Sequence, residues 1–277
     1  GMALGIASTF GSIGQCAALP YTHIIIEQYG WSQALLILAA CSLVIVPLAF
    51  GLINKTARST DDGNQPPAST SHTMMQALAE ARQSPSFWLL NAGFFVCGFQ
   101  VVFIAVHLPS YLTDKGFTML FATVALTLIG LGNIIGSFFC GVLGDIYSRK
   151  YLLSGLYLLR SIIIAAFILT PVSGTSIIIF SLAIGLLWLG TVPLTSGLVA
   201  QIYGTTYMST LFGIVFFSHQ LGSFFGSWLA GRLFDITGSY DVMWWAAIGF
   251  GIISALLHWP ISEQPIERPL KHLNTAT

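Results

Sequence analysis

Charged side chains are scarce in this sequence, and their scarcity excludes most classes of soluble protein. Only 7% of the 277 residues are Asp, Glu, Lys or Arg, and 55% are hydrophobic, whereas soluble domains carry about 25% charged residues. Such a chain has too little polar surface to face water, so we expect an all-α, polytopic membrane protein. Ten basic residues balance ten acidic ones, which leaves no basic surface for nucleic acid.

Recognisable motifs for enzymatic chemistry are missing as well. The four cysteines (Cys16, Cys41, Cys97 and Cys140) lie in apolar stretches without CxxC spacing. This pattern indicates small buried side chains rather than a disulfide framework or a metal site. The sequence has no HExxH or GxSxG motif and no paired carboxylates at depth. We therefore expect a protein that is not an enzyme, with no catalytic residues, no metal and no cofactor.

Eight apolar stretches are long enough to cross a bilayer, whose core of about 30 Å needs roughly 20 helical residues. They lie at about 2–26, 31–53, 87–112, 118–143, 151–171, 175–200, 208–234 and 240–261. In the second half of the linker at 54–86, "TMMQALAEARQ" has helical spacing and predicts a short helix on the membrane surface. The predicted parts are two helices at 1–53, the linker at 54–86, a six-helix bundle at 87–262 and a tail at 263–277.

The basic residues set the expected orientation, because cytoplasmic loops are enriched in Lys and Arg. One side of the predicted spans carries seven of them: Lys55, Arg58, Arg82, Arg149, Lys150, Arg268 and Lys271. The other side carries Lys115, with Arg232 near a helix end. The central linker and the C-terminal tail are therefore expected in the cytoplasm.

An internal repeat predicts that the chain is part of a larger symmetric protein. Shifted by 208 residues (213 − 5), "GIASTFGSIGQ" at 5–15 aligns without gaps with "GIVFFSHQLGS" at 213–223. The first two spans then correspond to the last two, and the other four have no counterpart. Parallel repeats of six-helix halves are typical of many secondary transporters. We expect a twelve-helix protein of which this chain holds helices 5 to 12; chance similarity between two glycine-rich helices is the alternative.

Residues 141–150, "GVLGDIYSRK", resemble the loop motif Gly-x-x-x-Asp-x-x-Gly-Arg-Lys of the major facilitator superfamily, which lies between helices 8 and 9. Gly141, Asp145, Arg149 and Lys150 match it, and Ser148 stands where glycine is usual. The glycine allows close helix approach, and the aspartate can meet a cation or a helix N-terminus at the membrane edge. We expect these four matching residues to take part in gating.

Four longer segments resemble bacterial monocarboxylate-transporter-like members of that superfamily, and the match runs essentially end to end. They are "HLPSYLTDKGF" (107–117), "LIGLGNIIGSFFCGVLGD" (128–145), "LLWLGTVPLTSGLVAQIYG" (186–204) and "FFSHQLGSFFGSWLAG" (216–231). The resemblance implies the major facilitator fold, here without its first four helices, in the inner (plasma) membrane of a bacterium. It also implies transport of small organic anions such as lactate or pyruvate, often with a proton. The animal monocarboxylate transporters differ, because they carry an Asp and an Arg inside helix 8, where residues 120–144 hold no charge.

His219 and Gln220 interrupt the apolar run "GIVFFSHQLGSFFG" at 213–226. His219 lies about 16 Å into its span, near the midplane, where ionisable groups are costly and call for a functional explanation. Gly11 is its equivalent in the repeat, so shared packing does not require the histidine. A protonated imidazole can bind an anion and release its proton when the anion leaves. We expect both residues to bind substrate; a structural histidine bonded to a carbonyl is the alternative.

Four more polar residues are predicted to bind substrate, each with a packing alternative. Arg160, about 15 Å deep, is the one permanent charge near the midplane of the predicted spans. Its guanidinium fits a carboxylate bidentately, or it pairs with carbonyls of another helix. Gln100 lies on a helix that lines the cavity in the resembled family. Asn133 lies among glycines, where interhelical hydrogen bonding competes with ligand contact, and Thr191 lies on the helix that contains Pro193.

His107 and Pro193 complete the predicted gating set. His107 follows Gln100 by two helical turns and lies near the outer end of its span, just before Pro109. We expect it to cap or gate that side, with interface packing as the alternative. Pro193 breaks the backbone hydrogen-bond ladder and permits a kink, although such kinks also occur without a function.

The sequence thus predicts a secondary active transporter of a small organic anion, coupled to protons and working by alternating access. Its expected partners are that anion, protons and the lipid bilayer, and the full-length protein is expected to be a monomer. Two alternatives stay open: a major facilitator transporter of another small solute, including drug efflux, and a fragment that cannot enclose a cavity alone. The lack of Asp or Glu deep in the predicted spans argues against a cationic solute.

Overall fold

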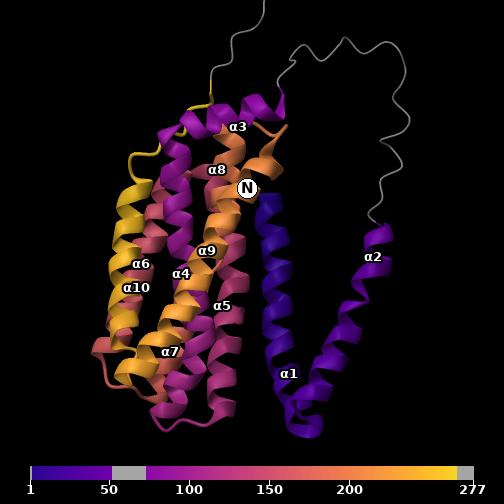
Figure 1. The fold of residues 1–277 in the computed structure, drawn as a ribbon, viewed down its shortest axis with the longest axis vertical. Helices are drawn as coiled ribbons and strands as arrows, with labels where there is room; N and C mark the ends of the chain where they lie inside the picture. The colour runs from indigo at the N-terminus through magenta and orange to yellow at the C-terminus, as the bar shows by residue number, and fades with distance from the viewer. Residues whose placement is uncertain (1, 52–72, 267–277) are drawn as a thin grey trace, which may run out of the picture. The chain divides into compact units, whose positions relative to one another are not determined.

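The computed structural model describes residues 2–51 and 73–266, and within them the only regular structure is helical. The helices in chain order are α1 (Met2–Ser42), α2 (Ile45–Gly51), α3 (Met74–Gln83), α4 (Pro85–Asp114), α5 (Met119–Ile146), α6 (Arg149–Leu169), α7 (Gly174–Leu186), α8 (Thr191–Tyr203), α9 (Met208–Thr237) and α10 (Asp241–His258) (Figure 1). The predicted all-α class is confirmed. Most of the predicted linker and tail, at 52–72 and 267–277, falls outside the described residues.

The described part of the chain contains seven stretches that are long and apolar enough to cross a membrane. The first, Met2–Gly51, has 50 residues, which would extend about 75 Å as one straight helix. A bilayer core is only about 30 Å thick. Gly30 divides this stretch, since its φ of 75° and ψ of 165° are not helical. Counted on either side of Gly30, the spans number eight, as the sequence predicts.

The chain forms two compact units. Of the described residues, 2–20 and 74–266 belong to one unit, and 21–51 with Thr73 belong to the other. In the second unit, the chain folds back at Gly30, so that the Tyr21 hydroxyl lies 3.9 Å from the Cys41 sulfur. The first unit holds α3 to α10 and every residue predicted to bind substrate or to gate.

Helix starts in the first unit follow ordinary capping rules. Pro85 occupies the first turn of α4, where a missing N–H costs nothing. The Thr118 hydroxyl accepts from Phe121 N–H at 3.2 Å before α5, and Ser173 forms a capping box with Ser176 before α7. The predicted short helix of the linker is confirmed as α3, and its position on a membrane surface stays a prediction.

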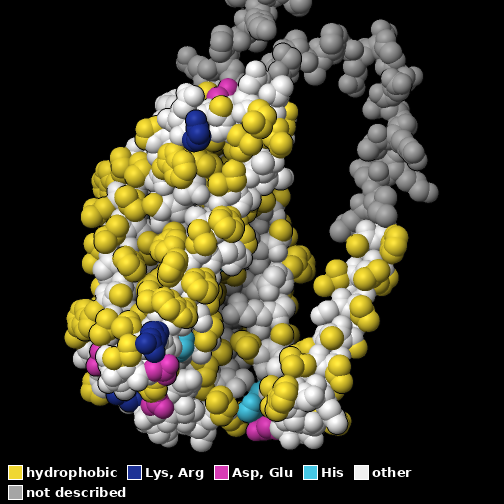
Figure 2. Space-filling model, in the orientation of Figure 1, with side chains coloured by type: hydrophobic (Ala, Val, Ile, Leu, Met, Phe, Trp, Pro, Cys, Tyr) yellow, Lys and Arg dark blue, Asp and Glu magenta, His cyan; other side chains and the backbone are white. Residues whose placement is uncertain are grey.

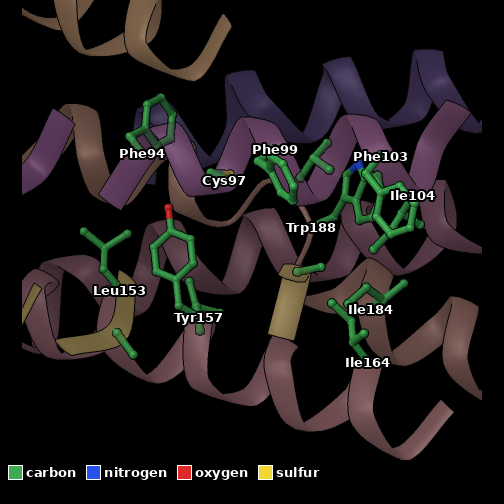
Figure 3. Close-up of a cluster of buried hydrophobic side chains, with 14 of the residues drawn as sticks. Phe94, Cys97, Phe99, Phe103, Ile104, Leu153, Tyr157, Ile164, Ile184 and Trp188 are labelled. Atoms are coloured by element: carbon green, nitrogen blue, oxygen red, sulfur yellow. The ribbon is translucent and has the colours of Figure 1, made fainter. Parts of the chain in front are cut away.

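The bundle of α4 to α10 is built around α4. Helix α4 packs along α9 and α10, α10 packs along α6, and α5 packs along α7. Aromatic side chains of α4, including Phe94, Phe99 and Phe103, are buried against Tyr157 of α6 and Trp188 (Figure 3). The outer surface of the bundle carries many exposed large apolar side chains, and Figure 2 shows them along its length with the visible charged side chains near its ends. Such a surface suits lipid rather than water.

Glycines bring two of these helix pairs into backbone contact. A Cβ at Gly222 of α9 would lie 1.9 Å from the Phe95 carbonyl oxygen of α4, and a Cβ at Gly136 of α5 would lie 1.9 Å from the Leu186 carbonyl oxygen of α7. No larger side chain fits at either position without separating the helices. Gly222 therefore sets the spacing of α4 with α9, and Gly136 sets the spacing of α5 with α7.

The structure refines two predicted spans. The span expected at 31–53 is interrupted at residues 43–44, between the end of α1 at Ser42 and the start of α2 at Ile45. The span expected at 175–200 is not one helix, because α7 ends at Leu186 and α8 begins at Thr191. Residues 187–190 between them form a turn, which we call the α7–α8 break. The physical reason lies in Pro193, two residues into α8.

Candidate functional site

The α7–α8 break follows from the missing N–H of Pro193. In a continuous helix, the carbonyl of Leu189 would accept from residue 193, but proline has no donor. Leu189 O accepts instead from Val192 N–H at 2.9 Å, so Val192 cannot serve the carbonyl of Trp188. Trp188 N–H in turn donates to Gly185 O at 2.9 Å, which deprives Leu189 N–H of its usual acceptor. Two backbone groups, Trp188 C=O and Leu189 N–H, thus need partners from elsewhere.

Arg160 of α6 serves the carbonyls of the break. Its Nη2 donates to Leu187 O at 2.5 Å and to Trp188 O at 2.8 Å, and its Nη1 donates to Gln100 Oε1 at 3.2 Å. The residue is 0% exposed. Among the described residues no carboxylate pairs with it. The hydrogen-bond acceptors of this buried positive charge are therefore carbonyl and amide oxygens together with the sulfur of Cys97.

Asn133 of α5 serves the amide of the break. Its Oδ1 accepts from Leu189 N–H at 3.0 Å and from the Ser137 hydroxyl at 2.9 Å. Both Asn133 and Ser137 are fully buried. Arg160 and Asn133 come from different helices and satisfy groups of opposite polarity in the same turn, so the break is held from two sides.

Gln100 of α4 links this centre to α10. Its Nε2 donates to Ala247 O at 2.7 Å while its Oε1 accepts from Arg160. Both halves of the buried amide are therefore occupied in this structure. Thr191, at the start of α8, lies beside the same group of residues, with its hydroxyl 3.2 Å from the sulfur of Cys97.

Cys97 and Tyr157 belong to this centre, although the sequence did not single them out. The sulfur of Cys97 lies 3.7 Å from Arg160 Nη1, the arginine is 5.4 Å from the centre of the Tyr157 ring, and the tyrosine hydroxyl points toward Cys97 (Figure 3). Helical spacing could have revealed both, because each lies three residues before a predicted polar residue on the same helix face: Cys97 before Gln100, and Tyr157 before Arg160.

His219 of α9 lies in an aromatic pocket next to this centre. It is 7% exposed, stacks on Phe216 with ring centres 5.3 Å apart, and lies 4.9 Å from the ring of Phe94. Its Nδ1 is 3.4 Å from the Ser223 hydroxyl. Its Nε2 is buried and has no hydrogen-bond partner among the described residues. An imidazole with one unused nitrogen can take up a proton or bind an anion.

Gln220 does not join His219. It is exposed on α9, because successive residues on a helix point about 100° apart. The two residues share a depth but not a helix face. Of the six residues predicted to bind substrate, Gln100, Asn133, Arg160 and Thr191 meet at the break, His219 lies beside them, and Gln220 lies apart. Substrate binding by any of them stays a prediction.

The predicted gating residues of the loop motif lie where α5, α6 and α8 meet. The guanidinium of Arg149 donates to Asp145 Oδ1 at 3.2 Å and also to the side-chain oxygen of Gln201 on α8. Lys150 Nζ donates to Ile261 O at 2.8 Å. The motif therefore fastens α5 and α6 to α8 and to the segment after α10. A Cβ atom added to Gly5 of α1 would lie 2.9 Å from the Cα atom of Gly141 in α5. The two helices are therefore in contact at these two glycines.

His107, at the other end of α4, joins α4 to α9 and α10. Its Nε2 lies 3.0 Å from Ser227 O and its Nδ1 lies 3.4 Å from the Tyr240 hydroxyl. A carbonyl only accepts, so Nε2 carries the proton and Nδ1 accepts from the phenol. Burial raises the pKa of Tyr240, and the charges of Asp114 and Asp235 raise it further, so the phenol keeps its proton as a donor.

Over residues 2–51 and 73–266, no three His, Cys, Asp or Glu side chains come together as a metal site would require. The chemistry available at the centre is therefore that of a buried cation, a thiol, a phenol, amides and an imidazole.

Comparison with protein families gives one family for the whole chain. The family model described as Major Facilitator Superfamily matches residues 1–227 and 122–274.

Individual proteins that match this chain at low sequence identity are named as transporters. The "Uncharacterized MFS-type transporter YcxA" of Bacillus subtilis (strain 168) is 28% identical over 271 residues, which cover 93% of this chain and 63% of that protein. "Monocarboxylate transporter 13" of Bos taurus is 24% identical and covers 97% and 62%, respectively. "Monocarboxylate transporter 12" of Homo sapiens is 27% identical and covers 91% and 54%. The chain thus spans less than two thirds of the length of these curated relatives.

Proposed function

The chain belongs to the Major Facilitator Superfamily, and on this premise we propose that the whole protein is a secondary transporter of a small organic anion of the monocarboxylate type, coupled to protons. This family consists of transporters rather than enzymes. Two of the relatives above are named monocarboxylate transporters, which supports the solute class. The twelve-helix architecture expected from the repeat would supply the remaining wall of a cavity.

The buried charge of Arg160 is the observation that carries the proposal. Within the described spans this guanidinium has no carboxylate partner, and its acceptors are Gln100, two backbone carbonyls and the sulfur of Cys97. A positive charge in a region of low dielectric attracts an anion strongly and repels a cation. The centre therefore favours a negatively charged solute even if the guanidinium itself stays on the carbonyls. Acidic residues lie only near the ends of the spans.

His219 is the proposed proton carrier. Imidazole is the side chain that changes charge in the physiological pH range, and Nε2 of His219 is buried without a partner among the described residues. Protonation would add a second positive charge beside Arg160, which is unfavourable unless an anion arrives with the proton. The proton and the anion therefore bind together and leave together, and this is the energetic basis of symport.

The orientation is proposed from charge. The end of the bundle that carries α3, Arg149 and Lys150 is placed in the cytoplasm, because basic residues concentrate there. On this basis His107 and Tyr240 face the outside of a bacterial plasma membrane.

Uptake into proteoliposomes tests the proposal. The full-length protein would be reconstituted, and uptake of labelled lactate and pyruvate followed with acid outside. We expect gradient-stimulated uptake that His219→Ala abolishes and that His23→Ala leaves unchanged, because His23 is paired with Glu27 outside the bundle of α4 to α10. No uptake of either acid would refute the solute class, and uptake unaffected by His219→Ala would refute the proton carrier.

A further inference from the structure

The α7–α8 break is held by side chains from two other helices, and we propose that Arg160 and Asn133 form a latch that fixes the geometry of this break during transport. In this role Arg160 is a positioning residue and not the binding site of the solute. The inference needs only a transporter with moving helices and does not depend on which solute is carried.

The hydrogen bonds of the break show why a latch is needed. Pro193 leaves Trp188 C=O and Leu189 N–H without partners in their own helix; the bond that Trp188 C=O accepts is buried, and the bond that Leu189 N–H donates is partly buried. Unsatisfied backbone groups at membrane depth are strongly disfavoured. Arg160 supplies the donor at 2.8 Å and Asn133 the acceptor at 3.0 Å. These two hydrogen bonds stabilise residues 187–190 in a turn conformation rather than in a distorted helix.

The chemistry of arginine fits this role. One nitrogen, Nη2, serves two consecutive carbonyls, while Nη1 reaches Gln100, which is itself bonded to Ala247 O. A lysine has one compact ammonium and cannot hold this planar fork. The hydrogen bonds of this fork connect the break to α6, α4 and α10. A movement of any of these helices would therefore change the angle between α7 and α8.

Close packing adds a second constraint on the same turn. A Cβ on Gly190, the last residue of the break, would lie 2.4 Å from the sulfur of Cys140 on α5. The break therefore lies directly against α5, where Asn133 originates. Discontinuous helices are typical of the binding sites of transporters, and this turn has one partner on each side that fixes its geometry.

Hydrogen–deuterium exchange of the full-length protein in nanodiscs tests the latch without a solute. We expect the backbone amides of 187–192 to exchange at least about fivefold faster in Asn133→Ala and in Arg160→Lys, as loss of one net hydrogen bond implies. The matched control is Ser161→Ala, next to Arg160 on α6, which loses bonds only to Tyr157 O and Ile248 O and should leave these amides unchanged. Unchanged exchange in both latch variants would overturn the proposal.

Transport kinetics separate positioning from solute binding. With labelled lactate as the probe, Arg160→Lys should lower Vmax about tenfold and leave KM within about twofold, and Asn133→Ala should do the same. The double variant should be no slower than the worse single variant, because residues of one network are not additive. A tenfold rise in KM at unchanged Vmax would make Arg160 a solute-binding residue and overturn the latch. If the native protein takes up no lactate, the proposed solute fails, while the exchange experiment still decides the latch.

Discussion

The guanidinium of Arg160 on α6 donates to the backbone carbonyl of Trp188 in the α7–α8 break at 2.8 Å, although the two residues are 28 positions apart. The bond joins the one buried arginine of α6 to a carbonyl that lost its helical partner because Pro193 has no N–H. A charge that would be costly in a membrane and a backbone defect that would be costly in a helix thus stabilise each other. The candidate site is built on this pair.

Replacing Pro193 by alanine should repair the helix. The new N–H can donate to Leu189 O, which frees Val192 N–H for Trp188 O and removes the need for Arg160. We expect α7 and α8 to join and transport of the natural solute to fall about tenfold. Tm should change little, because the gain of helical hydrogen bonds is offset by the loss of the carbonyl acceptors of buried Arg160. Thermal unfolding in detergent and uptake into proteoliposomes would measure the two effects.

Thr195→Ala is a suitable control for that variant, since Thr195 is buried two residues further along α8 and its hydroxyl has no partner among the described residues. It should leave both Tm and uptake near native values. If Pro193→Ala also left uptake near its native value, the break would have no part in transport.

Glycine contacts predict a large difference between two positions of α9. Gly222→Leu should destabilise the fold by about 3 kcal/mol, because the side chain would collide with the Phe95 carbonyl. Gly213→Ala should be neutral or slightly stabilising, since nothing lies within 4 Å of its Cβ position and alanine favours a helix over glycine. Tm in detergent compares the two, and equal values would contradict the packing of α4 on α9.

Most of the fold could be predicted from the sequence, because the length and hydropathy of a transmembrane helix are imposed by the bilayer. The eight spans and α3 were found in this way. The break at 187–190 was not, although Pro193 was recognised as a kink. A proline leaves the carbonyl four residues earlier without its helical hydrogen-bond donor. Whether the helix then bends or opens into a turn depends on side chains from other helices, here Arg160 and Asn133.

The candidate site was predicted only in part. Polar residues at depth are visible in a sequence, and four of those chosen do meet at the break. Most of their partners are backbone groups, which a sequence pattern does not locate. For Arg160 the sequence indicated carbonyls of another helix only as the alternative to a ligand, and for Gln100 it indicated no partner. The separation of Gln220 from His219 follows from helix geometry and could have been predicted from the sequence alone.

The loop motif should tolerate loss of its carboxylate better than loss of its arginine. Asp145→Asn should cost no more than about 0.5 kcal/mol, since the Asp145 side chain is 42% exposed and exposed ion pairs contribute little. Arg149→Ala should cost about 1–2 kcal/mol, because Gln201 of α8 loses its partner too. Thermal unfolding would show the order, and a larger loss for Asp145→Asn would show that the ion pair dominates.

At the opposite end of α4, Tyr240→Phe should have a small effect of about 0.5 kcal/mol, because the bond to His107 Nδ1 is long at 3.4 Å. His107→Phe should cost more, since it also leaves Ser227 O without its donor. Tm values of the two variants would test this order. Equal losses would mean that the Ser227 bond contributes nothing.

Proton movement during lactate uptake tests the central claim most directly. Full-length protein would be reconstituted into liposomes that hold a pH-sensitive dye, and the internal pH recorded after lactate is added outside, with protein-free liposomes as the control for passive entry of lactic acid. We predict an acidification faster than in the control, lost in His219→Gln and retained in His23→Ala. Acidification at the rate of protein-free liposomes would contradict proton-coupled anion transport by this protein.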